Sequence, residues 1–132
     1  MGNLIFWRRD IVTILKDAPR EGKPVFLNFF SPGWYYSQKM DTVSYSREDV
    51  IQILNDRVLP VRIAPENLPV FKHYTIKVTP AQVMIGSGGF ERQRSTGFLD
   101  GQEMMAFLLL GVGKFYFDDV RIDDALDMVN QL

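Results

Sequence analysis

The chain has no cysteine among its 132 residues. This absence excludes disulfide scaffolds, thiolate metal sites, iron–sulfur clusters and any thiol nucleophile. The chain also holds a single histidine, His73. It therefore lacks the further imidazole groups that a zinc site built from histidines, or a serine relay through a second imidazole, would need. We therefore predict no catalytic residue, no metal ligand and no cofactor.

Long hydrophobic runs and a surplus of one charge are missing as well. The longest apolar run, 104–110, is far shorter than the ~20 residues of a membrane span. Fifteen Lys and Arg against sixteen Asp and Glu give a net charge of −1, without the basic surplus typical of nucleic-acid binding. The first residues lack the charged start of a secretion signal. We expect a soluble chain, cytoplasmic as the sequence stands, or periplasmic if a signal peptide has been removed.

The residues that are present predict an α/β fold. A hydrophobic share of 46% and an aromatic share of 13% suffice for the core of one domain. We expect a central mixed sheet of four or five strands flanked by helices. Apolar spacing predicts strands over 25–30, 58–63, 81–85 and 90–96, and helices over 4–16, 46–54, 68–74, 101–110 and 114–132. Pro19 and Gly22 are expected to end the first helix, and Gly111 to follow the fourth.

The last segment carries a separate apolar stripe. Its members have helical spacing: Ile122, Leu126, Val129 and Leu132. We expect a domain over 1–113 and an extra C-terminal helix within 114–132, packed on that domain through this stripe. Self-association through the same helix is the alternative, because an apolar stripe left in water promotes aggregation.

Several short motifs lie next to the predicted strands and helices. Gly22-Lys23-Pro24 enters an apolar strand, Trp34 precedes a helix that contains Lys39-Met40, and Val78-Thr79-Pro80 precedes the third strand. Over about residues 4–112 the chain resembles the thioredoxin-like superfamily, most closely the bacterial thioredoxin-related domains that reduce or shuttle disulfides. The resemblance implies a thioredoxin-like fold with a cis peptide bond before Pro80, and a Cys-x-x-Cys motif directly after the Trp.

The chain departs from the family at that motif. Trp34 is followed by Tyr35-Tyr36-Ser37-Gln38, so Tyr35 and Gln38 occupy the positions of the two cysteines. Disulfide exchange needs an attacking thiolate and a second, resolving thiol, and neither side chain supplies sulfur. The redox activity that the resemblance implies is therefore not expected of this chain.

Three hypotheses about function remain. The first is a redox-inactive binding module that takes a protein or an extended peptide on the former active-site surface. That surface would comprise Trp34, Tyr35, Tyr36, Ser37, Gln38, Thr79 and Pro80. The second is a structural domain that forms a homodimer through its C-terminal helix. The third is a thioredoxin-related enzyme with non-thiol chemistry.

Overall fold

The centre of the sheet is the apolar run after Pro24. In the computed structural model, which describes residues 4–118 and 122–132, this run forms β1 (Val25–Phe29) and is buried at every position. Such a strand must be covered on both faces. It pairs in parallel with β2 (Leu59–Ile63) and antiparallel with β3 (Ala81–Ile85), which pairs antiparallel with β4 (Glu91–Thr96). The sheet is thus mixed and four-stranded, in the order β2-β1-β3-β4, as predicted.

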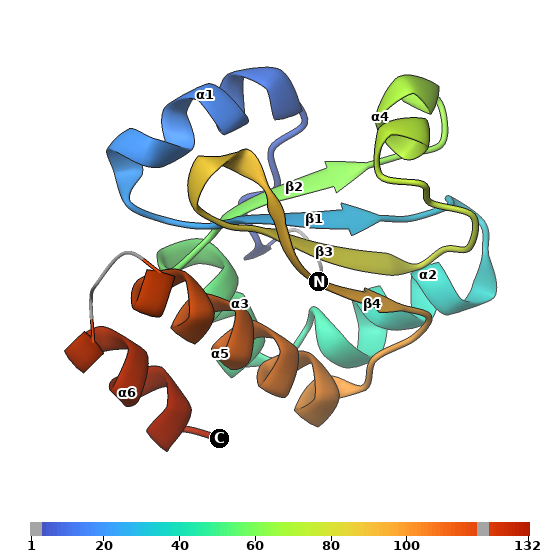
Figure 1. Ribbon diagram of the computed structural model, residues 1–132. Coiled ribbons are helices and arrows are strands. Elements are labelled where there is room, and N and C mark those ends of the chain that lie inside the picture. The colour runs from blue at the N-terminus through green and yellow to red at the C-terminus, as the bar shows by residue number, and fades with distance from the viewer. Residues whose placement is uncertain (1–3, 119–121) are drawn as a thin grey trace.

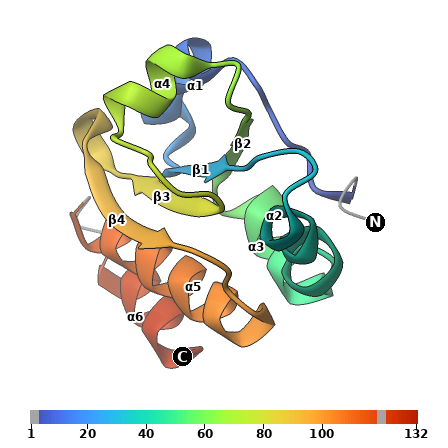
Figure 2. The same cartoon turned by 90° about the vertical axis from the view of Figure 1, so that its right-hand side faces the viewer.

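Helices cover the two faces of the sheet unequally (Figures 1 and 2). One face packs on α1 (Ile11–Glu21) and α4 (Leu68–His73), with Leu27 and Phe29 turned toward them. The other face, with Phe26 and Met84, packs on α3 (Glu48–Asp56) and α5 (Gly101–Asp118). The last helix, α6 (Ile122–Asn130), packs on α5 on the side away from the sheet (Figure 2). The two faces therefore hold separate apolar cores. Among the described residues, no helix is long and apolar enough to cross a membrane.

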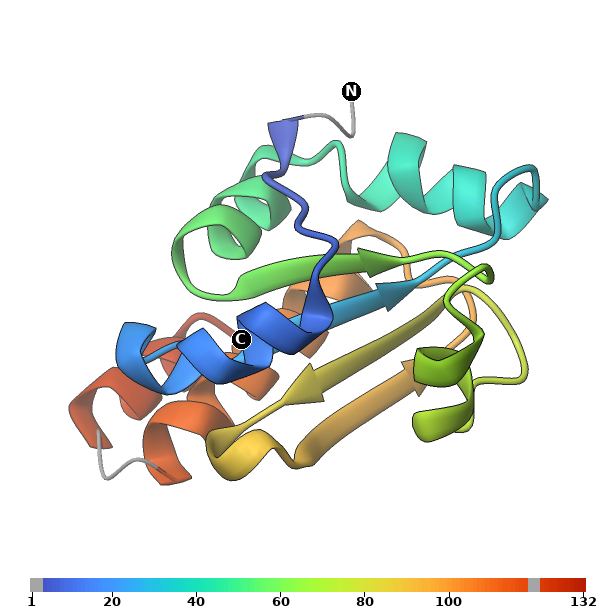
Figure 3. The same ribbon diagram turned by 90° about the horizontal axis from the view of Figure 1, so that it is seen from above.

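The first helix starts later than its apolar spacing predicts. The segment around Arg8 runs along the edge of the sheet (Figure 3): the Arg8 N–H donates to Pro60 O at 2.9 Å, and Arg62 N–H donates to Arg8 O at 2.9 Å. Asp10 then caps the helix, since its carboxylate accepts from the backbone N–H and the hydroxyl of Thr13. The predicted helical start at residue 4 is wrong, because strand pairing and this cap outweigh the spacing. Pro19 lies inside α1, and only Gly22, with φ of 63°, ends it.

Gly111 does not end the fourth predicted helix, which corresponds to α5 of the structure. α5 continues through Gly111 and Gly113 to Asp118, because both glycines lie where another element comes close. A Cβ at Gly111 would lie 2.7 Å from Met84 Cε, and one at Gly113 would lie 3.4 Å from Met128 Cβ. The predicted end near residue 110 is wrong. The expected boundary between 113 and 114 falls within this helix, and the division of the chain there stays a prediction.

The C-terminal helix packs on α5 through a face other than the one predicted. Ala125 and Met128 are buried in the core beside Val112 and Phe115. Leu126, Val129 and Leu132 are exposed by about half or more of their surface, and the side chain of Ile122 lies outside the described residues. The predicted burial of the stripe is therefore wrong for these three residues. Small side chains and a flexible Met allow the closer approach of the two helices.

A polar cluster underlies the end of β1 that carries the candidate site. The Arg62 guanidinium lies 4.6 Å from the ring centre of Trp7 and 4.9 Å from that of Phe30. It donates to Asp41 Oδ1 at 2.5 Å. The Asn28 amide, with its oxygen and nitrogen assigned from their neighbours, accepts from Arg62 Nε at 3.0 Å and donates to the Tyr45 hydroxyl at 3.3 Å. This Arg62 cluster ties β1 and β2 to the N-terminal segment and to the π-helix Met40–Ser44.

Because Tyr45 is buried, the stability of the fold is expected to fall at alkaline pH. Burial raises the pKa of Tyr45 above its ordinary value of about 10, because the phenolate would lose its hydration. The unfolded chain therefore releases this proton above pH ~10 while the folded chain keeps it. Stability from this group is complete below pH ~10 and falls above it by up to ~1.4 kcal/mol per pH unit.

We expect Tyr45→Phe to show a shallower loss of unfolding free energy than the natural chain above pH ~10. Urea denaturation at several alkaline pH values measures it, with Tyr36→Phe as the matched control on the surface. Tyr45→Phe with the same pH slope as Tyr36→Phe would contradict this assignment.

Candidate functional site

The segment after β1 presents three aromatic side chains to solvent. Trp34 is the N-cap residue of α2 (Tyr35–Lys39), a short helix that continues directly into the π-helix. Trp34, Tyr35 and Tyr36 are 48%, 60% and 44% exposed. Their rings pack edge to face, with centroids 5.9 Å apart for Trp34 and Tyr36 and 5.0 Å for Tyr35 and Tyr36. We call these three residues the aromatic platform.

The platform is held against the loop before β3. The Trp34 indole Nε1–H donates to Thr79 O at 3.0 Å, and the hydroxyls of Ser31 and Thr79 lie 2.7 Å apart. The Thr79–Pro80 peptide bond is cis. The fold therefore brings together Trp34 and Thr79, which are 45 residues apart in the sequence.

The seven predicted site residues differ in accessibility. Gln38 is exposed beside the platform, and Thr79 is partly exposed. Ser37 is buried and its Oγ accepts from the Ser31 backbone N–H at 3.1 Å. Pro80 is buried as well. Ser37 and Pro80 thus support the surface from beneath, and the other five residues are the ones that a partner can contact.

A hollow of about 360 Å³ lies beside Trp34. Its lining is Ser31, Trp34, Lys77, Val78 and Thr79. Val78 is 57% exposed, and its backbone N–H and C=O make no hydrogen bond with any described residue. Sequence reasoning quoted Val78 only as part of a motif and gave Ser31 and Lys77 no role. The sequence signal for Ser31, Lys77 and Val78 is only that each lies close in the sequence to Trp34 or Thr79 of the predicted surface.

Another residue that the sequence analysis did not place at the site is Phe98. The Lys39 ammonium lies 4.7 Å from the Phe98 ring centre and 5.9 Å from that of Tyr35. This cation links the platform to the segment between β4 and α5. The contact joins residues 59 apart, so no local pattern predicts it.

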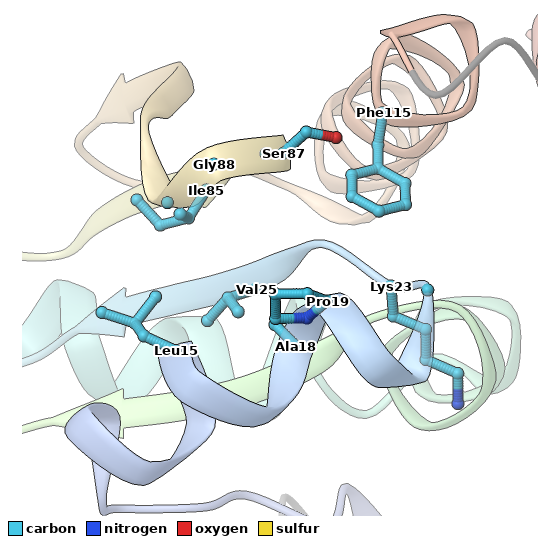
Figure 4. Close-up of a pocket in the computed structure, with 12 residues that line it drawn as sticks. Leu15, Ala18, Pro19, Lys23, Val25, Ile85, Ser87, Gly88 and Phe115 are labelled. Carbon is cyan, nitrogen blue, oxygen red and sulfur yellow. The ribbon is translucent and has the colours of Figure 1, made fainter.

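A second hollow lies at the opposite end of the sheet. It measures about 210 Å³ and lies between α1, the turn after β3 and Phe115 of α5 (Figure 4). Leu15, Pro19 and Val25 supply apolar walls, while the Lys23 ammonium points away from the cavity. Because Val25 begins β1 and Trp34 follows its end, this hollow is separate from the aromatic platform.

The side chains at and around the aromatic platform are aromatic rings, hydroxyls and an amide, together with the Lys39 and Lys77 ammonium groups. Within residues 4–118 and 122–132, no group of three or more His, Asp or Glu side chains is arranged to hold a metal ion. Exposed aromatic residues beside unpaired backbone groups are features of peptide-binding surfaces.

Comparison with known proteins identifies the family. The family described as "Thioredoxin-like domain" matches residues 12–110, about three quarters of the chain. The chain belongs to the thioredoxin-like family. No curated protein matched it.

Solved structures of thioredoxin-like proteins share this fold. A thioredoxin from Thermus thermophilus is 24% identical, with a TM-score of 0.69 over 79% of this chain and 84% of that one. A thioredoxin-fold protein from Helicobacter pylori is 12% identical, with a TM-score of 0.63 over 85% and 88%. The C-terminal domain of Neisseria meningitidis DsbD in its reduced form is 17% identical, with a TM-score of 0.60 over 74% and 89%.

This thioredoxin-like chain lacks the sulfur that dithiol chemistry requires. It contains no cysteine, and Tyr35 begins α2 where the resemblance placed the first cysteine of the family. A phenol or an amide does not exchange with a disulfide. Thiol–disulfide exchange is therefore not available to this thioredoxin-like chain.

Proposed function

We propose that this chain is a redox-inactive thioredoxin-fold module that binds an extended segment of a partner protein. The binding surface comprises the aromatic platform together with Gln38 and Thr79, supported by Ser37 and Pro80. The observation that carries the proposal is the exposure of three neighbouring aromatic rings beside a hollow. Aromatic side chains are enriched at interfaces because they bury a large area at a low cost in conformational entropy.

Val78, in the loop before β3, supports an extended partner in particular. The Val78 backbone N–H and C=O have no hydrogen-bond partner among the described residues, and the Val78 side chain borders the hollow. An extended peptide that pairs with free backbone groups gains affinity from them, and side-chain pockets beside them give specificity. The platform and the loop thus provide both parts of such a site.

A second candidate function is self-association through α6. Leu126, Val129 and Leu132 are exposed on this helix, and an apolar face of this kind is a feature of homodimer interfaces. This face belongs to a different helix from the aromatic platform, so variants distinguish the two functions.

The test selects peptides from a random displayed library on the purified chain and measures their affinity by fluorescence anisotropy. We expect Tyr35→Ser/Tyr36→Ser to weaken binding of the selected peptides by about thirtyfold or more, because truncating interface aromatics costs about 1–2 kcal/mol each. The control Leu126→Ser/Val129→Ser removes as many exposed apolar side chains from α6 and is expected to leave affinity unchanged. Sedimentation of both variants shows the oligomeric state.

Two results would contradict the proposal. One is a library from which no peptide is enriched. The other is binding that survives Tyr35→Ser/Tyr36→Ser, together with a dimer that Leu126→Ser/Val129→Ser converts into a folded monomer. The second result would support self-association instead.

A further inference from the structure

A second hollow shares a lining residue with the hollow beside Trp34. It measures about 310 Å³ and is lined by Leu68, Phe71, Lys72, Thr75, Ile76 and Lys77. Lys77 also lines the hollow beside Trp34, so the two hollows border the same residue. Figure 1 shows α2 and α4 at the same end of the sheet, beyond the ends of β1 and β2. We call these two hollows together the α4 groove.

Apolar side chains line both hollows of the α4 groove. Val78, in the hollow beside Trp34, is 57% exposed. In the neighbouring hollow, Leu68 is 53% exposed and Ile76 is partly exposed. Separate apolar contacts of this kind suit an extended peptide, whose alternate side chains point the same way.

The charge along the α4 groove has one sign. Both charged residues that line it, Lys72 and Lys77, are exposed and form no ion pair with any described residue. The Lys39 ammonium lies beside Tyr35 at the platform end. On a chain whose net charge is −1, this is a local positive surface.

Two carboxylates of the chain are paired with arginines: Asp41 with Arg62, and Glu91 with Arg94. Glu66 lines a different hollow together with Arg9 and Arg62. No carboxylate of the described residues forms an ion pair with Lys72 or Lys77, so both ammonium groups are open to a carboxylate of a partner.

The loop that carries Lys77 has a defined shape. Thr75 has φ of 55°, a left-handed conformation that β-branched residues rarely adopt. It is held by two backbone hydrogen bonds, from Thr75 N–H to Lys72 O at 3.1 Å and from Ile76 N–H to Phe71 O at 2.9 Å. A loop fixed in advance loses less entropy when a partner binds.

We propose that the partner segment is an acidic extended peptide. An apolar side chain enters the hollow beside Trp34, and Asp or Glu carboxylates pair with Lys77 and Lys72 along the α4 groove. This inference rests on the proposed function, because it names the partner class for the same surface. Charge complementarity selects the acidic class, since like charges would repel at these lysines.

The test uses three synthetic peptides of alternating residues: Val–Glu, Val–Gln and Val–Lys repeats of equal length with a fluorescent label. We expect Val–Glu to bind about fivefold to tenfold more tightly than Val–Gln at low salt, because two exposed ion pairs each contribute a factor of a few. We expect Val–Lys to bind more weakly than Val–Gln. Salt is expected to reduce the preference for Val–Glu, since it screens exposed charges.

Matched variants locate the effect. Lys72→Gln/Lys77→Gln is expected to equalise the affinities for Val–Glu and Val–Gln. Lys16→Gln/Lys23→Gln changes the net charge equally but lies on and directly after α1, and is expected to retain the preference.

Each other result overturns the inference in a recognisable way. Equal binding of Val–Glu and Val–Gln, both lost in Tyr35→Ser/Tyr36→Ser, contradicts the acidic class and leaves the proposed function standing. A preference for Val–Glu that survives Lys72→Gln/Lys77→Gln places the acidic site elsewhere on the chain. Binding of none of the three peptides up to millimolar concentration contradicts the acidic class, and the peptides selected from the library then decide the proposed function.

Discussion

Replacing Arg62 with Met is expected to lower the free energy of unfolding by about 3 kcal/mol. We expect no substitution of another charged residue to have a larger effect on stability. Arg62 is the hub of its cluster: it donates to Asp41 and Asn28 and stacks on Trp7 and Phe30. The variant keeps an unbranched apolar stem, so most of the packing remains. The polar partners lose their donor, and that loss dominates.

The size of the effect follows from burial. The Arg62 side chain is 19% exposed and Asn28 is 1% exposed, so water replaces the lost donor poorly. A buried polar group left without a partner costs about 1–3 kcal/mol, and a cation–π contact adds about 1 kcal/mol. The exposed pair Arg20 and Asp17 is the matched control, because its Arg side chain is 80% exposed.

Urea denaturation of the two variants measures this difference. Arg20→Met is expected to change the unfolding free energy by less than about 0.5 kcal/mol, as exposed pairs do. If Arg62→Met and Arg20→Met fall within about 1 kcal/mol of each other, the Arg62 cluster does not stabilise the fold as described.

The natural chain is expected to reduce insulin no faster than the protein-free blank, because it contains no cysteine. The double variant Tyr35→Cys/Gln38→Cys is expected to exceed that blank clearly. The two positions are three residues apart in α2 and therefore lie about 5–6 Å apart on one helix face, within reach of a disulfide. A thiol at the exposed position of Tyr35 is open to a substrate disulfide.

The variant Tyr35→Ser/Gln38→Ser controls for the loss of the two natural side chains and is expected to remain at the blank. Thiol titration before and after oxidation shows whether the introduced pair closes. Turnover by the natural chain would contradict the absence of redox chemistry. A pair that does not close after oxidation would contradict the arrangement of these two positions on α2.

The sequence predicted the sheet well because each strand has a local signature. β1 is an apolar run that only Asn28 interrupts, and the glycines between β3 and β4 mark a turn. The errors arose where long-range contacts decide. Apolar spacing suggested a helix from residue 4, but pairing of Arg8 with Val61 keeps that segment extended. A glycine such as Gly111 often follows the end of a helix, but here its missing side chain makes room for Met84 within α5.

The candidate site was predicted in part for the same reason. Trp34 and Thr79 were found because each lies in a short motif, and the structure places them within one hydrogen bond of each other. The α4 groove was not predicted, since Lys77 comes to line a hollow together with Trp34 only through the fold. The Arg62 cluster joins Asn28, Asp41 and Arg62 from three elements, and no spacing along the chain reveals it.

Peptide binding by the aromatic platform is most directly tested at the indole of Trp34. The chain has two tryptophans, so its nitrogen-edited NMR spectrum contains two indole N–H signals. The Trp34 indole donates to Thr79 at the platform, while the Trp7 indole N–H is buried beside the Arg62 cluster and provides an internal reference. We predict that titration with the tightest peptide from the library shifts the Trp34 signal in a saturable way and leaves the Trp7 signal in place. Saturable binding of that peptide with an unmoved Trp34 signal would contradict the account.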